Sequence, residues 1–246
     1  MSLLEVRGIS KSYGGVQALR DVSFTIAAGE LVAMIGPNGA GKTTCFNVLN
    51  GQLAPDSGAV RLAGRSIAGR PPRAVWRLGV GRSFQITATF GSMSVRENVQ
   101  VALLSLNRKT FSARGRAPAL YRVEADALLA RVGMLEQAER TCALLAYGDL
   151  KRVDLALALA NQPKLLLMDE PTAGMARGER GEVMALASAA ARSDGIAVLF
   201  TEHDMDVVFE HADRVIVLHS GEVLASGPPR AVRADARVQE VYLGAP

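Results

Sequence analysis

The sequence has 246 residues, enough to bury a full hydrophobic core in one large domain or in two small ones. Hydrophobic residues make up 49% of it and charged residues 21%, a balance that is typical of a folded protein and excludes an intrinsically disordered one. The formal net charge is only +4. The longest apolar runs fall far short of the roughly 18 residues that span a bilayer, so we expect no transmembrane segment.

The N-terminus and the cysteines indicate where the chain resides. The first residues lack a basic segment followed by an apolar stretch, so we expect no secretory signal and a cytoplasmic location. Cys45 and Cys142 are too few for a disulfide framework and lack the spacing of metal ligands. We therefore expect two reduced thiols.

The first predicted elements are strands. Segments 4–9 and 22–26 alternate apolar and polar residues, which predicts an antiparallel flanking sheet, and 58–63 is compatible with the same sheet. Residues 31–35 are apolar throughout, as is typical of a parallel strand that is buried on both faces. We expect this strand to lead through a Gly-rich turn into a helix over about 41–50, closed by Gly51.

Helical patterns dominate the middle of the chain. Ser94 and Glu97 have the spacing of a capping box and predict the start of a helix that continues over 98–104. The remaining expected elements are a polar loop over 105–118, helices over 123–132 and 149–161, buried strands over 165–168 and 197–200, a hairpin of 215–218 with 221–226, and helices to 243. The alternation of strands and helices predicts an α/β fold with a mostly parallel sheet. We assign 1–246 to a single domain, with a helical subdomain at about 85–150.

The turn after the strand at 31–35 carries the strongest motif. It fits G-x-x-x-x-G-K-[ST] and consists of Gly36, Pro37, Asn38, Gly39, Ala40, Gly41, Lys42, Thr43 and Thr44. Glycines let the backbone N–H groups wrap around a polyphosphate, and the following helix N-terminus favours negative charge. Lys42 adds a full positive charge, and Thr43 places a hydroxyl where it can ligate Mg²⁺. The motif therefore predicts that ATP and Mg²⁺ are the cofactors.

Two adjacent acids, Asp169 and Glu170, end the buried strand at 165–168. Ligands of open α/β sheets gather at this carboxyl edge, so we expect Asp169 to hold Mg²⁺ directly or through water. Glu170 is expected to orient and polarise the water that attacks the γ-phosphate. In isolation the pair is equally well explained as a solvated strand end, but beside the phosphate loop it predicts ATP hydrolysis.

His203 follows the strand at 197–200, so it should emerge at the same sheet edge, within reach of the γ-phosphate and Glu170. A catalytic role is one interpretation, although a lone histidine is more often structural. Neither His211 nor His219 completes a metal site.

The phosphate loop, LLLMDE at 165–170 and TEHD at 201–204 resemble, in this order, the nucleotide-binding subunits of ATP-binding cassette (ABC) transporters, over nearly the whole chain. The resemblance implies a P-loop NTPase core with a flanking antiparallel β subdomain and an α-helical subdomain. It also implies that Tyr13 stacks on adenine and that Gln85 touches Mg²⁺ and senses the transmembrane partner. Without it, Tyr13 would be assigned to turn packing and Gln85 to an ordinary polar loop.

In this family a signature, typically LSGGQ, caps the γ-phosphate that the other subunit of a dimer binds. It aligns here with Leu145, Ala146, Tyr147, Gly148 and Asp149. Ala146 lacks the serine hydroxyl, and Asp149 puts an anion where glutamine is expected, although an acid also suits the first turn of a helix. The loop 171–176 lacks the aspartate common in the family. If the partner subunit carries a full signature, we therefore expect a competent site at Lys42 and a slow site wherever this chain's signature is used.

Within the family, the segment 84–99, the Leu-Ala-Tyr-Gly run and the ending 240–244 resemble the ATPase subunits of branched-chain amino acid importers. The resemblance implies a second ATPase subunit in a homo- or heterodimer, two transmembrane permease subunits and a periplasmic solute-binding protein reached through the complex. The chain would then lie peripherally on the cytoplasmic face of the inner membrane. Branched-chain amino acids, amides, urea and aromatic acids all remain open as solutes.

Two alternatives share the nucleotide chemistry. One is the ATPase of a lipopolysaccharide-export system, against which the signature and the C-terminal ending argue. The other is a non-transport ATPase acting in translation or on chromosomes, which would suit the seven arginines from Arg61 to Arg96 with no acid between Asp56 and Glu97. A solvated surface explains that run as well. Such ATPases usually carry two cassettes or a long coiled coil, so we expect no nucleic-acid partner.

Overall fold

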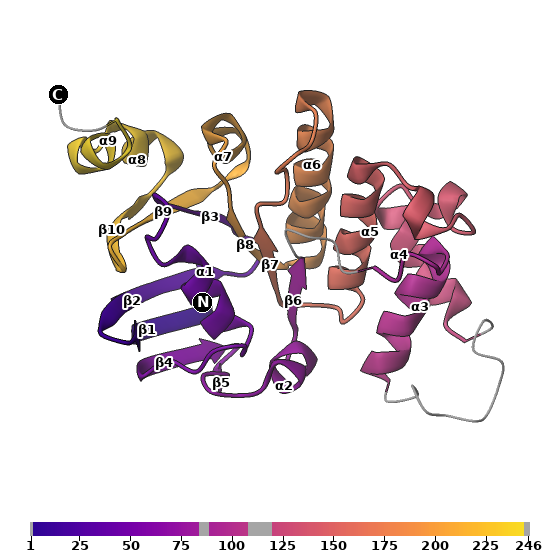
Figure 1. Ribbon diagram of the computed structural model, residues 1–246, viewed down its shortest axis with the longest axis horizontal. Helices are drawn as coiled ribbons and strands as arrows, with labels where there is room; N and C mark the ends of the chain where they lie inside the picture. The colour runs from indigo at the N-terminus through magenta and orange to yellow at the C-terminus, as the bar shows by residue number, and fades with distance from the viewer. Residues whose placement is uncertain (1, 84–88, 108–119, 244–246) are drawn as a thin grey trace.

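The computed structural model describes residues 2–83, 89–107 and 120–243, and the statements below concern those residues. Their strands form two sheets, one of six strands in the order β10-β9-β3-β8-β7-β6 and one of four in the order β2-β1-β4-β5. Figure 1 shows helix α1 between the two sheets and the helices α3 to α6 gathered toward the opposite end from β10. None of the described helices is both long and apolar enough to cross a bilayer.

The six-stranded sheet is parallel except for its edge strand β10, which pairs antiparallel with β9. Its strands are β3 (Leu31–Ile35), β6 (Val80–Ser83), β7 (Leu165–Asp169), β8 (Ala197–Thr201), β9 (Arg214–His219) and β10 (Glu222–Gly227). Every residue of β3 and β8 is buried, as their unbroken apolar runs predict for strands covered on both faces. The α/β fold class and the predicted hairpin of β9 with β10 are thereby confirmed.

Strand β6 is a correction to the sequence-based expectation, which placed no strand between 63 and 94. Its four residues, VGRS, include a glycine and an arginine, so they show neither an apolar run nor alternation. The strand exists because it pairs in parallel with β7, where Arg82 lies opposite Leu167. Its conformation is thus a product of tertiary pairing, which local pattern does not report.

The flanking sheet is antiparallel, as predicted, but its first two strands are longer than expected. Its strands are β1 (Ser2–Tyr13), β2 (Val16–Ala27), β4 (Ser57–Leu62) and β5 (Arg65–Ser66). Gly14 and Gly15 form a two-residue turn between β1 and β2, and both have positive φ, +50° and +91°. Glycine supports this turn without strain, so the strands extend up to it and Tyr13 lies at the end of β1.

Helix α1 (Lys42–Leu49) lies between the two sheets and joins them into one core. Phe46 and Leu49 on this helix are fully buried, in a cluster that includes residues of β1, β2, β3, β7 and β8. The predicted helix over 41–50 is confirmed, with Gly41 as its N-cap and Asn50 as its C-cap. Because α1 is held on both sides, the loop at its N-terminus has little freedom to move.

The other helices pack mainly around the second core cluster or at the edges of the sheets. They are α2 (Pro72–Arg77), α3 (Val95–Leu106), α4 (Arg122–Arg131), α5 (Tyr147–Leu159), α6 (Arg177–Asp194), α7 (Met205–His211), α8 (Pro229–Ala234) and α9 (Ala236–Leu243), with short 3₁₀ turns at Leu135–Gln137 and Cys142–Leu144. Helix α3 runs to Leu106, past the predicted end at 104, and 108–119 lies outside the described residues. The assignment of 85–150 to a helical subdomain stays a prediction.

Both cysteines are buried free thiols, in agreement with the expectation from the sequence. Burial raises the pKa of Cys45 to about 12 and also raises the pKa of Cys142. A thiol with a raised pKa carries little reactive thiolate at neutral pH, so neither is placed for thiol chemistry.

The N-terminus of α3 allows a direct test of the capping box. Ser94 Oγ accepts from the backbone N–H of Glu97 at 3.2 Å, and Glu97 Oε2 accepts from the backbone N–H of Ser94 at 2.8 Å. Ser94→Ala should lower the free energy of unfolding by about 1 kcal/mol, measured by urea denaturation, because one N–H loses its acceptor. Ser193→Ala, at an exposed position inside α6, is the control and should change it by less than about 0.5 kcal/mol. Equal effects of the two substitutions would contradict the capping role.

Candidate functional site

The phosphate loop lies against neighbouring backbone so closely that glycine is required at two positions. A Cβ added to Gly36 would lie 2.2 Å from the carbonyl oxygen of Leu218, and one added to Gly41 would lie 2.5 Å from that of Ala18. Gly39 meets nothing within 4 Å, but its φ is +81°, a conformation that L side chains rarely adopt. The loop is therefore a close-fitting backbone cradle between β3 and α1.

Lys42 lies in this loop with only 8% of its surface exposed. Its ammonium donates to the carbonyl oxygen of Gly36 at 2.6 Å and to that of Pro37 at 3.1 Å. Burial lowers the pKa of Lys42, while the nearby carboxylates of Glu170 and Asp169 act in the opposite direction. The positive charge is therefore held between the loop, the predicted catalytic base Glu170 and the predicted metal ligand Asp169.

A cavity of about 340 Å³ opens over the loop. It is lined by Tyr13, Ala18, Asn38, Gly39, Ala40, Gly41, Lys42, Thr43, Thr44, Glu170 and His203. The structure thus brings together most of the residues that the sequence predicts for nucleotide binding. Tyr13 is 48% exposed, so its ring is available to a ligand and is not part of the core.

Asp169 ends β7 and makes two contacts that the sequence did not predict. Its Oδ1 accepts from the hydroxyl of Thr201 at 2.8 Å, and its Oδ2 accepts from Nη2 of Arg82 at 3.1 Å. Thr201 stands opposite Asp169 in the β7–β8 pairing, and Arg82 comes from β6 on the other side. No local sequence signal reveals contacts between strands that are so far apart in the chain.

Glu170 and His203 form a pair at the edge of the cavity. His203 Nε2 lies 3.0 Å from Glu170 Oε1. Glu170 adopts a left-handed backbone conformation with φ of +48°, which is uncommon for a residue other than glycine and recurs at functional sites. This backbone turn follows directly from the strand end and points the carboxylate toward His203.

A buried carboxylate, Glu202, connects the loop after Glu170 to the strand end before His203. Its Oε1 accepts from the backbone N–H of Thr172 at 2.8 Å and from the Thr172 hydroxyl at 2.7 Å. Only 5% of its surface is exposed. No local pattern in the sequence predicts this role, although Glu202 stands inside the TEHD motif, because its partner Thr172 lies in a different segment of the chain.

The signature segment does not line this cavity. Ala146 is the N-cap of α5 and offers no side-chain hydrogen bond, and Asp149 in the first turn accepts from Gln137 Nε2 at 3.1 Å. Tyr147 beside them is 44% exposed. Gln85, the remaining predicted residue, lies outside the described residues.

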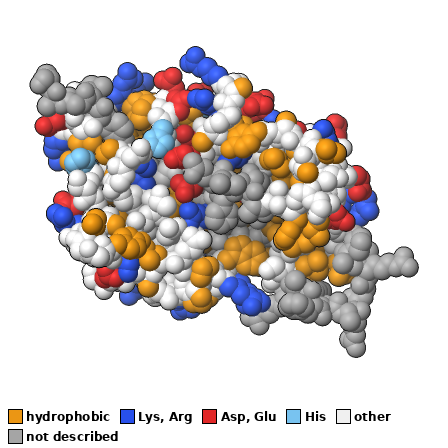
Figure 2. Space-filling view, in the orientation of Figure 1, with side chains coloured by type: hydrophobic (Ala, Val, Ile, Leu, Met, Phe, Trp, Pro, Cys, Tyr) orange, Lys and Arg blue, Asp and Glu red, His pale blue; other side chains and the backbone are white. Residues whose placement is uncertain are grey.

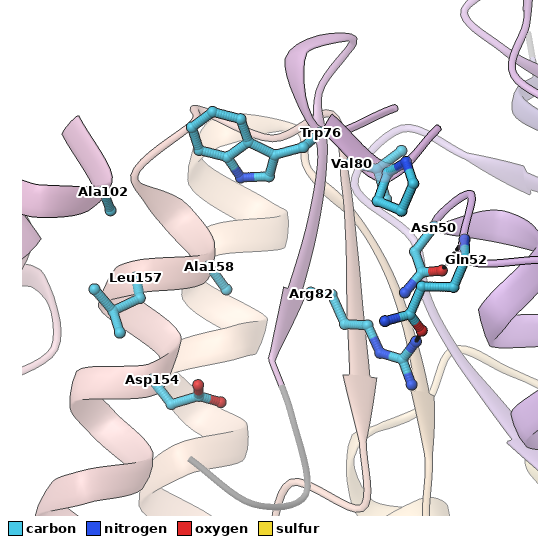
Figure 3. Close-up of a pocket in the computed structure, with 10 residues that line it drawn as sticks. Asn50, Gln52, Trp76, Val80, Arg82, Ala102, Asp154, Leu157 and Ala158 are labelled. Atoms are coloured by element: carbon cyan, nitrogen blue, oxygen red, sulfur yellow. Dashed lines mark hydrogen bonds between the residues drawn. The ribbon is translucent and has the colours of Figure 1, made fainter. Parts of the chain in front are cut away.

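A second hollow lies between α2, β6, α3 and α5, and we call it the α2–α5 groove. It consists of two adjoining cavities of about 260 and 460 Å³ that share Pro72, Trp76, Ala102 and Leu157. In Figure 2, orange hydrophobic side chains gather on the surface between α2 and α3. Figure 3 shows the α5 residues Asp154 and Leu157 on one side of the groove and Arg82 on the side of the sheet, with its guanidinium directed toward Gln52.

Comparisons with known proteins agree with this geometry. The family model described as "ABC transporter" matches residues 19–173, and one for the "branched-chain amino acid ATP-binding cassette transporter" matches residues 222–246. The high-affinity branched-chain amino acid transport ATP-binding protein LivG of Salmonella typhimurium is 39% identical over 98% of both chains. BraF of Pseudomonas aeruginosa, with the same description, is 36% identical over the same shares.

Solved structures show the same relationship. The crystal structure of a nucleotide-free ATP-binding cassette from an ABC transporter superposes with a TM-score of 0.88 at 29% identity, covering 100% of each chain. An ATP-binding cassette in its ADP conformation superposes with a TM-score of 0.88 at 30% identity over the same shares. The chain therefore belongs to the ABC transporter family, within which it is an ATP-binding cassette of the branched-chain amino acid transport type.

Proposed function

We propose that the chain is the ATP-hydrolysing subunit that energises an importer for branched-chain amino acids or related small solutes. The observation that carries the proposal is the cavity over the phosphate loop, where Lys42 and the Glu170–His203 pair meet in a chain 39% identical to LivG. The transported solute would be selected by other subunits, because this chain contributes the nucleotide chemistry.

The described residues fit ATP with Mg²⁺. The groups that line the cavity include backbone N–H groups of a Gly-rich loop, the Lys42 ammonium and the hydroxyls of Thr43 and Thr44, all suited to phosphate. No group of three or more metal-ligating acids, histidines or cysteines exists in the part of the chain that the structure describes. Mg²⁺ is typically held by one or two protein oxygens and the phosphates of its nucleotide. Thr43 and Asp169 offer such oxygens, and the ion would neutralise the phosphate charge.

The proposed hydrolytic step follows from the Glu170–His203 pair. The Glu170 carboxylate takes a proton from the attacking water, and His203 fixes that carboxylate through the 3.0 Å contact. Lys42 exchanges its two loop carbonyls for phosphate oxygens when ATP binds. Glu202 holds the loop after Glu170 through Thr172, so Glu170 and His203 keep their positions relative to each other.

The signature segment supports a dimeric arrangement. It does not line the chain's own cavity, and its residue Tyr147 and the preceding Leu144 are 44% and 66% exposed. We propose that this surface covers ATP bound by a second ATPase subunit. Ala146 brings no hydroxyl to that ATP and Asp149 brings a negative charge, so the partner's site would turn over slowly.

We further propose that the α2–α5 groove receives a short segment of a permease subunit. Its lining is largely apolar, and Arg82 on its wall bonds Asp169 at the nucleotide site. A segment seated there would contact a residue directly connected to the ATPase chemistry. The complex would place the chain peripherally on the cytoplasmic face of the inner membrane, with two permeases and a periplasmic solute-binding protein.

The lipopolysaccharide-export alternative is less well supported. The export ATP-binding protein LptB of Acidithiobacillus ferridurans is 34% identical over 98% of this chain, below the 39% of LivG. The match of residues 222–246 to the branched-chain family model also favours amino acid import.

Lys42→Ala and Glu170→Gln should separate nucleotide binding from hydrolysis. Lys42→Ala removes the loop's ammonium and should abolish measurable ATP binding by the subunit. Glu170→Gln should retain ATP but lower the turnover of the assembled transporter by about a hundredfold or more, because the base is lost. Lys164→Ala, at an exposed position remote from the cavity, is the control and should change neither. Unchanged turnover in Glu170→Gln would refute the proposed chemistry.

The signature predicts unequal sites in a dimer with a partner subunit that carries a complete signature. Glu170→Gln in this chain should remove most turnover, since its ATP faces the complete signature. The matching substitution in the partner should remove much less. Steady-state ATPase rates of the two singly substituted complexes check this, with wild-type complex as reference, and equal losses would exclude the asymmetry.

Filling the groove should block assembly while leaving nucleotide binding intact. Ala102→Phe adds bulk inside the groove, so co-purification with the permeases should fall while ATP affinity stays within about twofold of the wild type. Val123→Phe adds similar bulk at a position that is 79% exposed and outside the groove, and should leave assembly unchanged. Normal assembly of Ala102→Phe would exclude the groove as the docking site.

A further inference from the structure

Arg82 lies between the predicted metal ligand and the α2–α5 groove. Its Nη2 donates to Asp169 Oδ2 at 3.1 Å, while its Nη1 donates to Asn47 Oδ1 at 2.8 Å and to Gln52 Oε1 at 3.0 Å. The same side chain lines the groove, and Figure 3 shows it beside Gln52. One nitrogen of the guanidinium thus contacts Asp169 at the nucleotide site, and another nitrogen contacts two amide oxygens.

The fold gives this contact its strength. Arg82 and Asp169 have side chains that are 10% and 17% exposed, so their ion pair is largely withdrawn from solvent. The guanidinium also lies 5.9 Å from the centre of the Phe46 ring, on the helix that follows the phosphate loop. Separating a buried charge from its counter-charge is unfavourable, so a group that displaces Arg82 from Asp169 must itself bring positive charge to that carboxylate.

Both carboxylate oxygens of Asp169 are engaged in this arrangement. One carboxylate oxygen accepts from Thr201 and the other from Arg82. A magnesium ion that uses Asp169, directly or through water, brings two positive charges to the carboxylate that already neutralises Arg82. The two cations repel each other, so the binding of one weakens the hold on the other.

We propose that Arg82 is a positioning residue that neutralises Asp169 in the nucleotide-free cassette and competes with Mg²⁺ for it, linking the groove to the metal site. The inference rests on the proposed function and deepens it. Asn47 and Gln52 accept from the other terminal nitrogen, so they retain the guanidinium beside the site when its bond to Asp169 breaks. A groove occupant that draws Arg82 away from Asp169 strengthens Mg²⁺ binding. Because coupling between two sites is reciprocal, Mg²⁺ binding in turn strengthens the binding of that occupant to the groove.

The test compares ATP affinity with and without the metal. The dissociation constant of ATP is measured by calorimetry on the full-length subunit in EDTA and in excess Mg²⁺. The value in EDTA divided by the value in Mg²⁺ gives the contribution of Mg²⁺ to ATP binding. Arg82→Gln removes the competing charge and should raise this ratio about tenfold, within the usual range of coupling between sites. Arg82→Lys keeps the charge and should stay near the wild-type ratio. Arg73→Gln removes an exposed charge at the groove that bonds no site residue, and should change nothing.

A second variant leaves both members of the ion pair in place. Gln52→Ala deletes an acceptor that holds the other terminal nitrogen of the guanidinium, so Arg82 should hold Asp169 less tightly and the ratio should rise, by less than in Arg82→Gln. This variant decides the question if Arg82→Gln does not fold. An unchanged or lowered ratio in folded Arg82→Gln or in Gln52→Ala would overturn the inference. Absence of ATP binding by the wild type in both buffers would instead refute the proposed function.

The single tryptophan of the sequence supplies a readout of the groove. Trp76 lines both cavities of the groove, so its emission reports on that surface alone. Adding Mg²⁺ to the ATP-bound subunit should change Trp76 emission in the wild type and leave it unchanged in Arg82→Gln. An equal change in both proteins would show that the metal reaches the groove by another route and would contradict the role of Arg82.

Discussion

The parallel pairing of β7 with β8 places Asp169 directly opposite Thr201, and the geometry of the candidate site depends on this register. The pairing brings the turn at Glu170 and the segment at His203 to one sheet edge, where the two side chains meet at 3.0 Å. Successive side chains of a strand point to opposite faces, so a slip of one residue would turn these groups away from each other. The hydrogen bond from the Thr201 hydroxyl to Asp169 Oδ1, at 2.8 Å, is made only in this register.

The phosphate loop is fixed by a different part of the core. Residues of β3 alternate between the two core clusters: Leu31, Ala33 and Ile35 belong to one, and Val32 and Met34 to the other. Helix α1 belongs to the cluster of Val32 and Met34, between the two sheets. The loop that joins β3 to α1 is therefore anchored at both ends by buried side chains. Rigid anchoring matters because oriented N–H groups stabilise phosphate without the cost of ordering them.

Sequence patterns identified those parts of the fold whose conformation is dictated locally. Unbroken apolar runs located β3, β7 and β8, the spacing of Ser94 and Glu97 located the start of α3, and the glycine motif located the phosphate loop. The same reasoning missed β6 and the helices α2, α6 and α7, which have mixed or partly exposed sequences and are stabilised by neighbouring elements. It also missed the contacts of Asp169, because its partners come from other strands.

Asp149, one of the departures from the usual signature, has a structural role within this subunit that composition alone does not reveal. Asp149 accepts a hydrogen bond from Gln137 and lies in the first turn of α5, where negative charge is favourable to the helix. Within this chain the acid is therefore satisfied and stabilising. Its unfavourable effect would arise only when a second subunit presents a triphosphate to that helix end, since two negative groups would then meet at a low-dielectric contact. Favourable packing of Asp149 within the subunit is thus compatible with a poor contribution to a partner's site in the proposed dimer.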